Sequence, residues 1–125
     1  MIKLTYVLHR RPELAREEFQ QYWLENHAPL VASVQDALRI KRYIQVHTFA
    51  DAGDDPNSPR GKMHDAHDGV AELWWESLED IAEAQETPEG AAAAQLLFED
   101  EAKFIDFTRS SSAFAQEHPI IPGAD

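Results

Sequence analysis

The chain has 125 residues, of which 43% are hydrophobic, and a formal net charge of -12 at pH 7. This length and composition fit one globular domain with its own core, so we expect a single domain over residues 1–125. The negative charge excludes nucleic acid as a partner, because phosphate binding needs clustered Lys and Arg. No leader-like segment and no apolar run approaching about 20 residues is present, so we expect a cytoplasmic protein with no membrane contact.

The first part of the chain predicts a strand followed by a helix. Residues 2–9 alternate with period two and are rich in β-forming side chains, which is typical of a strand. Pro12 suits the first turn of a helix that runs to about His27. Pro29 disfavours helical geometry at the residue before it, so we expect the helix to end or bend just after His27, with another helical turn or two over residues 30–34.

A second strand and a long loop follow. Alternation over residues 39–49 predicts a strand with Tyr43, Gln45 and His47 on one side. Residues 50–68 break the pattern with Gly, Pro and many Asp, and we expect an exposed loop between two halves of the chain.

The second half repeats the strand, helix and strand order. Residues 69–76 form a strand pattern, and Ser77 has the spacing of a helix N-cap. Thr87, followed by Pro88, predicts the start of a second helical segment that ends near residue 106. Residues 109–117 predict a weaker strand, and residues 118–125 form a tail.

This order is the βαββαβ pattern of the α+β ferredoxin-like fold with an antiparallel sheet. Helices cover one face of such a sheet, so the other face meets solvent or another protein. Tyr43, His47 and the apolar side chains of residues 69–76 would expose too much apolar surface on a monomer. The pattern therefore predicts a homodimer through the sheet face.

An aromatic stripe lies on the first helix. Phe19, Tyr22, Trp23 and His27 recur at the three- and four-residue spacing of one helix face. Such a stripe can line a pocket, or its aromatic residues can belong to the core while His27 caps or packs. The stripe alone leaves both interpretations open.

Several separated motifs resemble those of the EthD-domain family, a branch of the dimeric α+β barrel superfamily. The motifs are residues 10–14 after the first strand, the aromatic stripe with residues 27–31, residues 42–45 with His47, residues 68–74, and residues 100–106. The resemblance covers nearly the whole chain. It implies two ferredoxin-like subunits packed sheet to sheet, with a cleft between each sheet and its helices.

The resemblance also implies where functional side chains lie. His27, His47 and Glu72 match the family's positions for polar groups near the cleft, and these three are the candidate catalytic residues. The candidate walls of the substrate pocket are Tyr6, Tyr22, Trp23, Tyr43 and Trp74. Imidazole titrates near pH ~6.5, so either histidine could exchange a proton with a substrate at neutral pH.

Glu72 has a second interpretation. A carboxylate in the middle of a strand is costly to bury unless it is hydrogen-bonded, ion-paired or functional. Arg42 or a histidine could pair with it across the sheet, and Glu72 would then be structural or exposed at the rim of the barrel.

We expect neither a metal nor a cofactor. The chain has no cysteine, which excludes thiolate ligands and nucleophiles. Residues 50–68 include His64, His67, Asp68 and further aspartates, but a Gly- and Pro-containing loop gives metal ligands little support, and we expect it to act as a mobile cover. The serines at 110–112 lack the surroundings of an activated nucleophile.

Members of the EthD-domain family degrade or tailor small organic molecules, generally without a bound metal or organic cofactor. The resemblance therefore implies a cofactor-independent enzyme that acts on a small, mostly apolar cyclic compound in catabolism or secondary metabolism. Histidine acid/base chemistry would serve an isomerase, a lyase or an oxidoreductase. The alternative is a non-catalytic protein that binds such a compound beside a true oxygenase, and a purely structural role is a third possibility. A catalytic site needs a histidine facing an enclosed cavity with a second polar group nearby, whereas a carrier needs only apolar walls.

Overall fold

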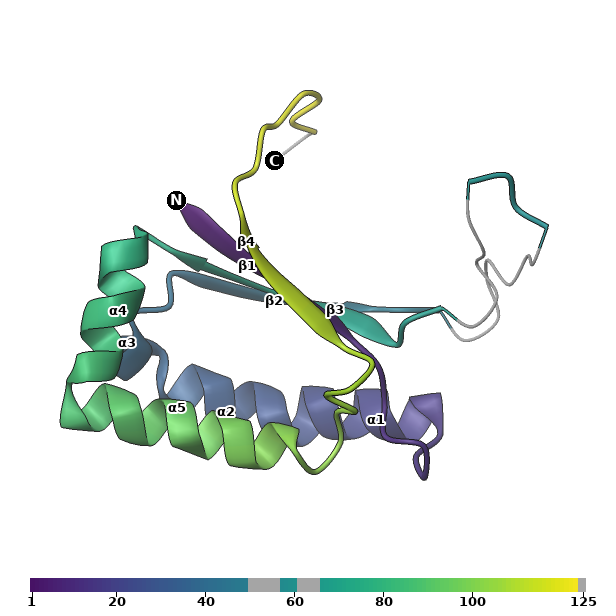
Figure 1. Cartoon of the computed structure of the whole chain (residues 1–125), viewed down its shortest axis with the longest axis horizontal. Helices are drawn as coiled ribbons and strands as arrows, with labels where there is room; N and C mark the ends of the chain where they lie inside the picture. Colours follow the sequence, from purple (N-terminus) through teal and green to yellow (C-terminus); the bar gives the residue numbers. More distant parts are fainter. Residues whose placement is uncertain (50–56, 61–65, 124–125) are drawn as a thin grey trace.

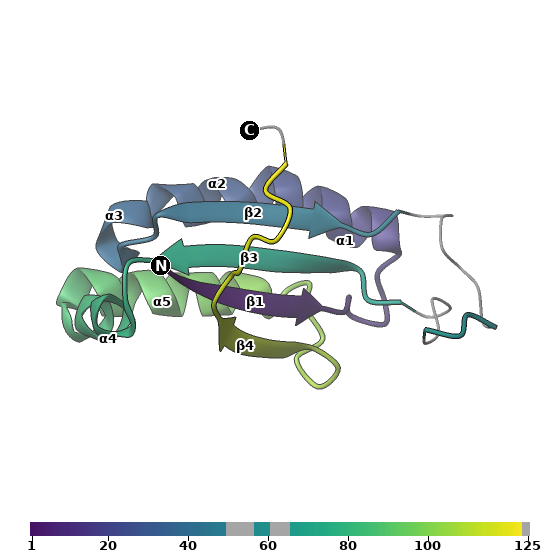
Figure 2. The ribbon, with the colours of Figure 1, turned by 90° about the horizontal axis from the view of Figure 1, so that it is seen from above.

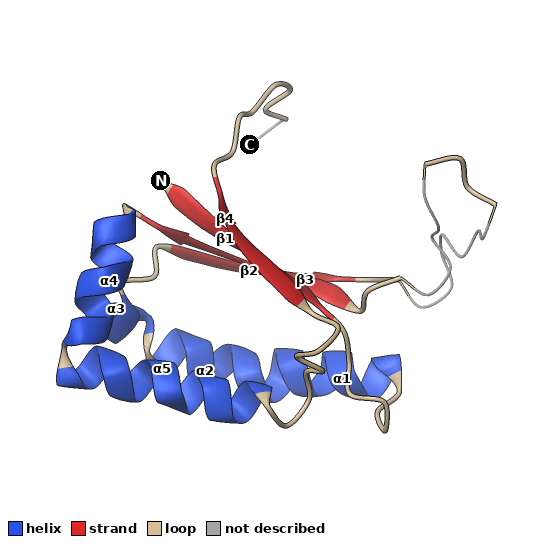
Figure 3. Ribbon diagram, viewed as in Figure 1, coloured by secondary structure: helices blue, strands red, loops and turns tan. Residues whose placement is uncertain are grey.

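The computed structural model describes residues 1–49, 57–60 and 66–123. One four-stranded antiparallel sheet carries all its helices on one face (Figures 1 and 3). The elements in chain order are β1 (Ile2–Leu8), α1 (Arg16–Tyr22), the π-helix η1 (Trp23–His27), α2 (Ala28–Ser33), α3 (Gln35–Leu38), β2 (Arg42–His47), β3 (Gly69–Trp75), α4 (Leu78–Glu86), α5 (Pro88–Glu101) and β4 (Ser111–Ala115). The strand order is β2-β3-β1-β4, which confirms the predicted ferredoxin-like fold.

The two central strands, β1 and β3, set the register of the sheet. Leu4 pairs with Leu73 and Tyr6 pairs with Ala71, and all four side chains face the helices. Because side chains alternate along a strand, Lys3 and Glu72 point away from the helices, toward the open face of the sheet.

Strand β2 corrects one expectation about the open face of the sheet. Tyr43, Gln45 and His47 lie on the helix side, where Gln45 donates a hydrogen bond to the Trp23 carbonyl at 2.9 Å. The open face instead receives the opposite set of β2 side chains, which includes Ile44 and Val46.

The first helical stretch does not end at Pro29 but changes its hydrogen-bond pattern before it. The Ala28 N–H donates to the carbonyl of Trp23, five residues back, and α2 then begins with Pro29 in its first turn. This wider π turn lets the chain pass a residue that has no N–H and that would distort a regular α-helix. The predicted bend after His27 is therefore a π-helix within a longer helical path.

The second helical stretch begins as predicted. Ser77 accepts a hydrogen bond from the Asp80 N–H at 3.1 Å, and Thr87 accepts one from the Gly90 N–H at 2.9 Å. The helix α5 ends at Glu101, five residues earlier than expected. The chain turns there because Ile105 enters the core and bridges to Arg10 beside the end of β1.

Asp68 ties three elements together. Its side chain is 1% exposed and accepts hydrogen bonds from the Arg10 backbone N–H at 2.7 Å, the Arg10 guanidinium at 2.6 Å and the Arg16 guanidinium at 2.8 Å. These contacts hold the end of β1, the start of α1 and the start of β3. Asp68 therefore belongs to the framework, not to the exposed loop in which the sequence pattern placed it.

The C-terminal tail leaves β4 on the open side of the sheet and projects away from it, opposite the helices (Figures 1 and 2). Glu117 anchors its start by accepting a hydrogen bond from the Trp74 indole at 2.6 Å and lying 3.7 Å from Lys3. Ile120 and Ile121 follow with exposed fractions of 86% and 89%. Within the described residues, the helices are all too short or too polar to span a membrane.

Candidate functional site

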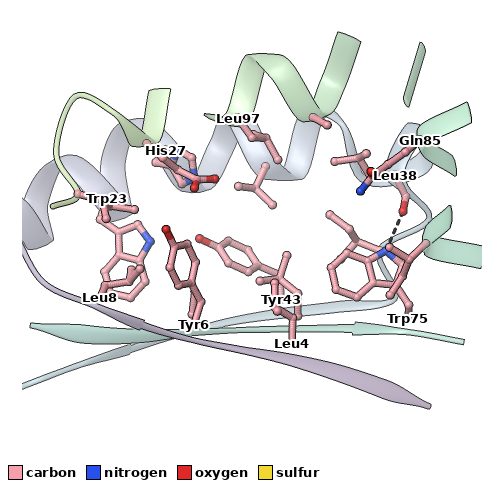
Figure 4. Close-up of a pocket in the computed structure, with 18 residues that line it drawn as sticks. Leu4, Tyr6, Leu8, Trp23, His27, Leu38, Tyr43, Trp75, Gln85 and Leu97 are labelled. Carbon is pink, nitrogen blue, oxygen red and sulfur yellow. Dashed lines mark hydrogen bonds and ion pairs between the residues drawn. The ribbon is translucent and has the colours of Figure 1, made fainter. Parts of the chain in front are cut away.

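A pocket of about 240 Å³ lies between the sheet and the helices (Figure 4). The aromatic stripe on α1 and η1 forms one wall, because Trp23 and His27 both line the pocket and are 1% and 4% exposed. The sheet supplies the floor through Tyr6, Tyr43 and further apolar side chains. The stripe thus belongs to the core and lines a pocket at the same time.

The two ends of the pocket differ in polarity. One end carries the hydroxyls of Tyr6 and Tyr43 near His27, whereas Trp75 and Leu38 lie at the other end, beside the exposed Gln85 (Figure 4). The rest of the lining is mostly aliphatic and comprises Leu4, Leu8, Val31, Ile40, Ala71, Leu73, Ile81, Ala94, Leu97 and Ile105, with Glu101 as the remaining polar member.

His27 is held by a buried carboxylate. Its Nδ1 lies 2.7 Å from one oxygen of Asp100, and the Tyr22 hydroxyl donates to the other oxygen at 2.6 Å. Burial would raise the pKa of Asp100, but the hydrogen bonds from Tyr22 and His27 outweigh it and lower the pKa. An ionised Asp100 can only accept a hydrogen bond, so Nδ1 carries the imidazole proton and donates it in this hydrogen bond. Nε2 is then the unprotonated, basic nitrogen.

The pKa of His27 is lowered from its ordinary value because burial disfavours the imidazolium, although Asp100 partly offsets the effect. His27 is therefore neutral at pH 7. A neutral imidazole with a fixed tautomer is suited to act as a general base.

Glu101 is the second titratable group of the pocket. Its carboxylate lies 3.9 Å from His27 Nε2, which is too long for a direct hydrogen bond but leaves both groups within reach of one ligand atom. Burial, followed by the charge on Asp100, raises the pKa of Glu101 to about 7. Glu101 can therefore hold or release a proton at neutral pH.

Two tyrosines complete the polar end. Burial, assisted by the charge on Glu101, raises the pKa of Tyr6 to about 12, so its hydroxyl remains a neutral hydrogen-bonding group. Burial also raises the pKa of Tyr43, whose hydroxyl accepts a hydrogen bond from Gln45 at 2.8 Å.

The position of Trp23 depends on a glycine in the facing strand. A Cβ atom at Gly69 would come within 2.5 Å of the Trp23 ring and 2.9 Å of the Val46 carbonyl. The sheet therefore admits the indole only where a strand residue has no side chain. The π turn at Trp23–His27 lies directly on this wall, and such turns are frequent at functional sites.

His47 does not reach the pocket. Its ring stacks on Trp23 with a centroid distance of 4.7 Å, and its Nε2 lies 2.8 Å from the Gln45 side chain. Burial lowers the pKa of His47. The residue supports the indole from behind and faces a separate shallow hollow beside Leu24 and Ala28.

Glu72 and Trp74 lie on the opposite face of the sheet, which corrects their expected position beside His27. Glu72 forms an ion pair with Lys3 at 2.6 Å, so the partner is neither Arg42 nor a histidine. Trp74 is covered by Lys3 and by Arg42, which lies 4.7 Å from the ring centroid. The alternation of β3 makes this placement unavoidable once Ala71 and Leu73 face the pocket.

Tyr22 also differs from its expected role as a wall of the pocket. It does not line the pocket but stands behind His27, on Asp100. The hydrogen bond and burial raise the pKa of Tyr22 to about 12.

The sequence analysis did not identify Asp100 and Glu101 as site residues. A signal was available, because both sit in the last turn of α5, where the helix dipole disfavours negative charge. With Glu99 they make three consecutive acids at the end of the helix, and acids at that position next to buried apolar residues indicate a specific use.

The aspartates at 54, 55 and 65 and His64 lie outside the described residues. Among the residues that are described, no three His, Cys, Asp or Glu side chains form a group that could hold a metal ion.

The fold and the pocket define a ferredoxin-like α+β protein with a partly enclosed, mostly apolar cleft between its sheet and its helices. The model of the EthD domain matches residues 11–108, and the chain belongs to the EthD-domain family. No curated protein matches the sequence.

Solved structures share this fold at low sequence identity. An EthD family protein from Bacillus halodurans C-125 is 21% identical with a TM-score of 0.60, and the match covers 94% of this chain and 99% of that one. A dimeric protein of ferredoxin-like fold from Bacteroides fragilis is 10% identical with a TM-score of 0.56, covering 93% and 95%. SnoaB, a cofactor-independent oxygenase from Streptomyces nogalater, is 14% identical with a TM-score of 0.50, covering 98% and 95%.

Proposed function

We propose that this protein is a cofactor-independent enzyme that moves protons on a small, mostly apolar cyclic compound. The observation that carries the proposal is the arrangement of His27, whose Nδ1 is tied to Asp100 while its ring lines an apolar pocket. Carbon–hydrogen or hydroxyl protons of a bound compound would pass to Nε2, and Glu101 would return a proton to another atom of the same compound. This sequence suits isomerisation or elimination and needs no oxidant.

The similarity to SnoaB supports chemistry without a cofactor, because that neighbour is described as a cofactor-independent oxygenase. An oxygenation of the same ligand class, with dioxygen as the oxidant and oxygen source, therefore belongs to the proposal as a second reaction type. The expected location in the cytoplasm stays a prediction.

We also propose that the protein is a homodimer through the open face of the sheet. Ile44, Val46 and Val70 lie on that face, and Val46 is 45% exposed. The similar protein from Bacteroides fragilis is described as dimeric. The exposed isoleucines of the tail project from the same side of the sheet, and contact with a second copy would bury them.

The test of the enzymatic proposal uses 1-tetralone, a ring ketone with exchangeable protons beside its carbonyl. Incubation in D₂O with the protein, followed by proton NMR, measures how fast these protons are replaced by deuterium. We expect exchange above the buffer rate, and His27→Gln should lower the protein-dependent rate by about 10²- to 10⁴-fold. His118→Gln, in the exposed tail, is the matched control and should exchange normally.

Exchange that survives in His27→Gln would remove this residue from the mechanism. Binding of 1-tetralone without any protein-dependent exchange would favour the carrier, for which the apolar lining alone is sufficient.

A further inference from the structure

We propose that the pocket selects neutral ring compounds that carry a hydroxyl or carbonyl oxygen, binds that oxygen beside His27 and Glu101, and rejects compounds whose polar group is a carboxylate. This inference rests on the site of the proposed function but concerns its ligand and not its reaction. It is carried by the charge and the distribution of the polar groups that line the cavity.

The polar end contains hydrogen-bonding groups but no cation. The groups that line it are His27, Glu101, Tyr6 and Tyr43, and the described residues of the lining include neither Lys nor Arg. Lys103 stands behind the site, 67% exposed and 3.5 Å from Asp100. A ligand carboxylate would therefore be desolvated beside Glu101 with no positive partner from the described lining residues.

A neutral oxygen meets complementary partners at the same place. The unprotonated His27 Nε2 accepts a hydrogen bond, and the acid form of Glu101 donates one. A ligand hydroxyl can donate to the first and accept from the second, and a carbonyl oxygen can accept from the acid. Without such an oxygen, the buried polar groups would lose hydrogen bonds to water and gain none.

The other end fits a ring. Trp75, Leu38, Val31, Ile40 and Leu97 form an apolar enclosure that offers contact but few hydrogen bonds. A cavity of roughly 150 Å³ is enough for benzene. The volume of about 240 Å³ here leaves room for one ring with substituents or a second fused ring.

Three probes with the same ring system test the selection. We expect 2-naphthol to bind about three- to tenfold more tightly than naphthalene, because it gains hydrogen bonds at the polar end. We expect 2-naphthoate to bind at least about tenfold more weakly than 2-naphthol, because its charge would be buried beside Glu101 without a cation. Isothermal titration calorimetry at pH 7 measures all three.

Two variants of the pocket test whether Glu101 and His27 cause this selectivity. Glu101→Gln removes the charge but keeps the shape, and it should narrow the gap between 2-naphthol and 2-naphthoate, whereas Glu99→Gln on the exposed side of α5 should leave the gap unchanged. His27→Gln should reduce the preference for 2-naphthol over naphthalene. Circular dichroism confirms that each variant is folded, and either pocket variant alone is sufficient for the test.

Equal or tighter binding of 2-naphthoate, equal binding of naphthalene and 2-naphthol, or no binding of any probe would overturn the inference. The proposed function fails separately. Exchange of 1-tetralone without the expected selectivity would leave the enzymatic proposal standing, and selectivity without exchange would leave a selective carrier.

Discussion

Asp100 acts on a ligand only through His27, so we regard it as a positioning residue. In Asp100→Asn the imidazole loses the carboxylate that fixes its Nδ1 proton and that raises its pKa. We expect the pKa of His27 to fall further, and the exchange of 1-tetralone to fall at least about tenfold. NMR titration of the His27 ring measures the first effect, and an unchanged His27 pKa would contradict the account.

The ionised form of Glu101 destabilises the folded state at and above neutral pH. Its pKa is about 7 in the folded state against an ordinary 4.5, so the folded state holds a proton that the unfolded state has already released. Stability is therefore lost as pH rises from about 4.5 to 7, by up to about 3 kcal/mol. A residue that destabilises its own fold is typical of a functional site.

The variant Glu101→Gln should remove this cost. We expect it to match or fall below the wild type in stability at pH 5 and to exceed it at pH 8, as measured by urea unfolding. A stability difference that does not change with pH would show that Glu101 titrates normally.

At the scale of elements, Asp68 holds the ends of the central strands β1 and β3 to the first helix. We expect Asp68→Asn to lower the free energy of unfolding by about 3 kcal/mol, because Arg10 and Arg16 would lose a buried ionic partner. Glu13→Gln breaks an exposed pair with Arg11 and should leave the unfolding transition nearly unchanged. Similar unfolding midpoints for the two variants would contradict the role of Asp68.

The elements themselves could be predicted where a local signal exists. Alternation gave the strands, and Ser77 and Thr87 mark helix starts through hydrogen bonds within one turn. The π turn at residues 23–27 was not predicted, because Pro29 indicates that the regular helix is interrupted but not which hydrogen-bond pattern replaces it. The end of α5 depends in the same way on the contact between Arg10 and Ile105.

The candidate site could also be predicted only in part, because local patterns do not show how distant segments pack together. A helical stripe reveals which residues share a face, so Trp23 and His27 could be placed together. Strand alternation gives two faces but does not say which one meets the helices, and Glu72 and Trp74 were assigned to the wrong one. Asp100 comes from the far end of the chain, and its contact with His27 appears only once α5 lies beside η1.

At the scale of the whole molecule, the open sheet face predicts self-association. Val46→Glu places a charge on the exposed apolar part of that face and should convert the proposed dimer to a monomer at micromolar concentration. Leu96→Glu, on the 41% exposed Leu96 of α5, is the matched control and should remain dimeric. Sedimentation velocity distinguishes the two species, and a wild-type monomer or a dimeric Val46→Glu variant would contradict this assembly.

The proposed function requires that a neutral His27 presents its free Nε2 to a ligand in the pocket. It is tested most directly by NMR of the protein with ¹⁵N-labelled histidine at pH 7, with and without 2-naphthol. We predict that His27 carries its proton on Nδ1, held by Asp100, and that the Nε2 resonance shifts when the probe binds. A His27 that carries its proton on Nε2, or a resonance that does not respond to bound 2-naphthol, would contradict it.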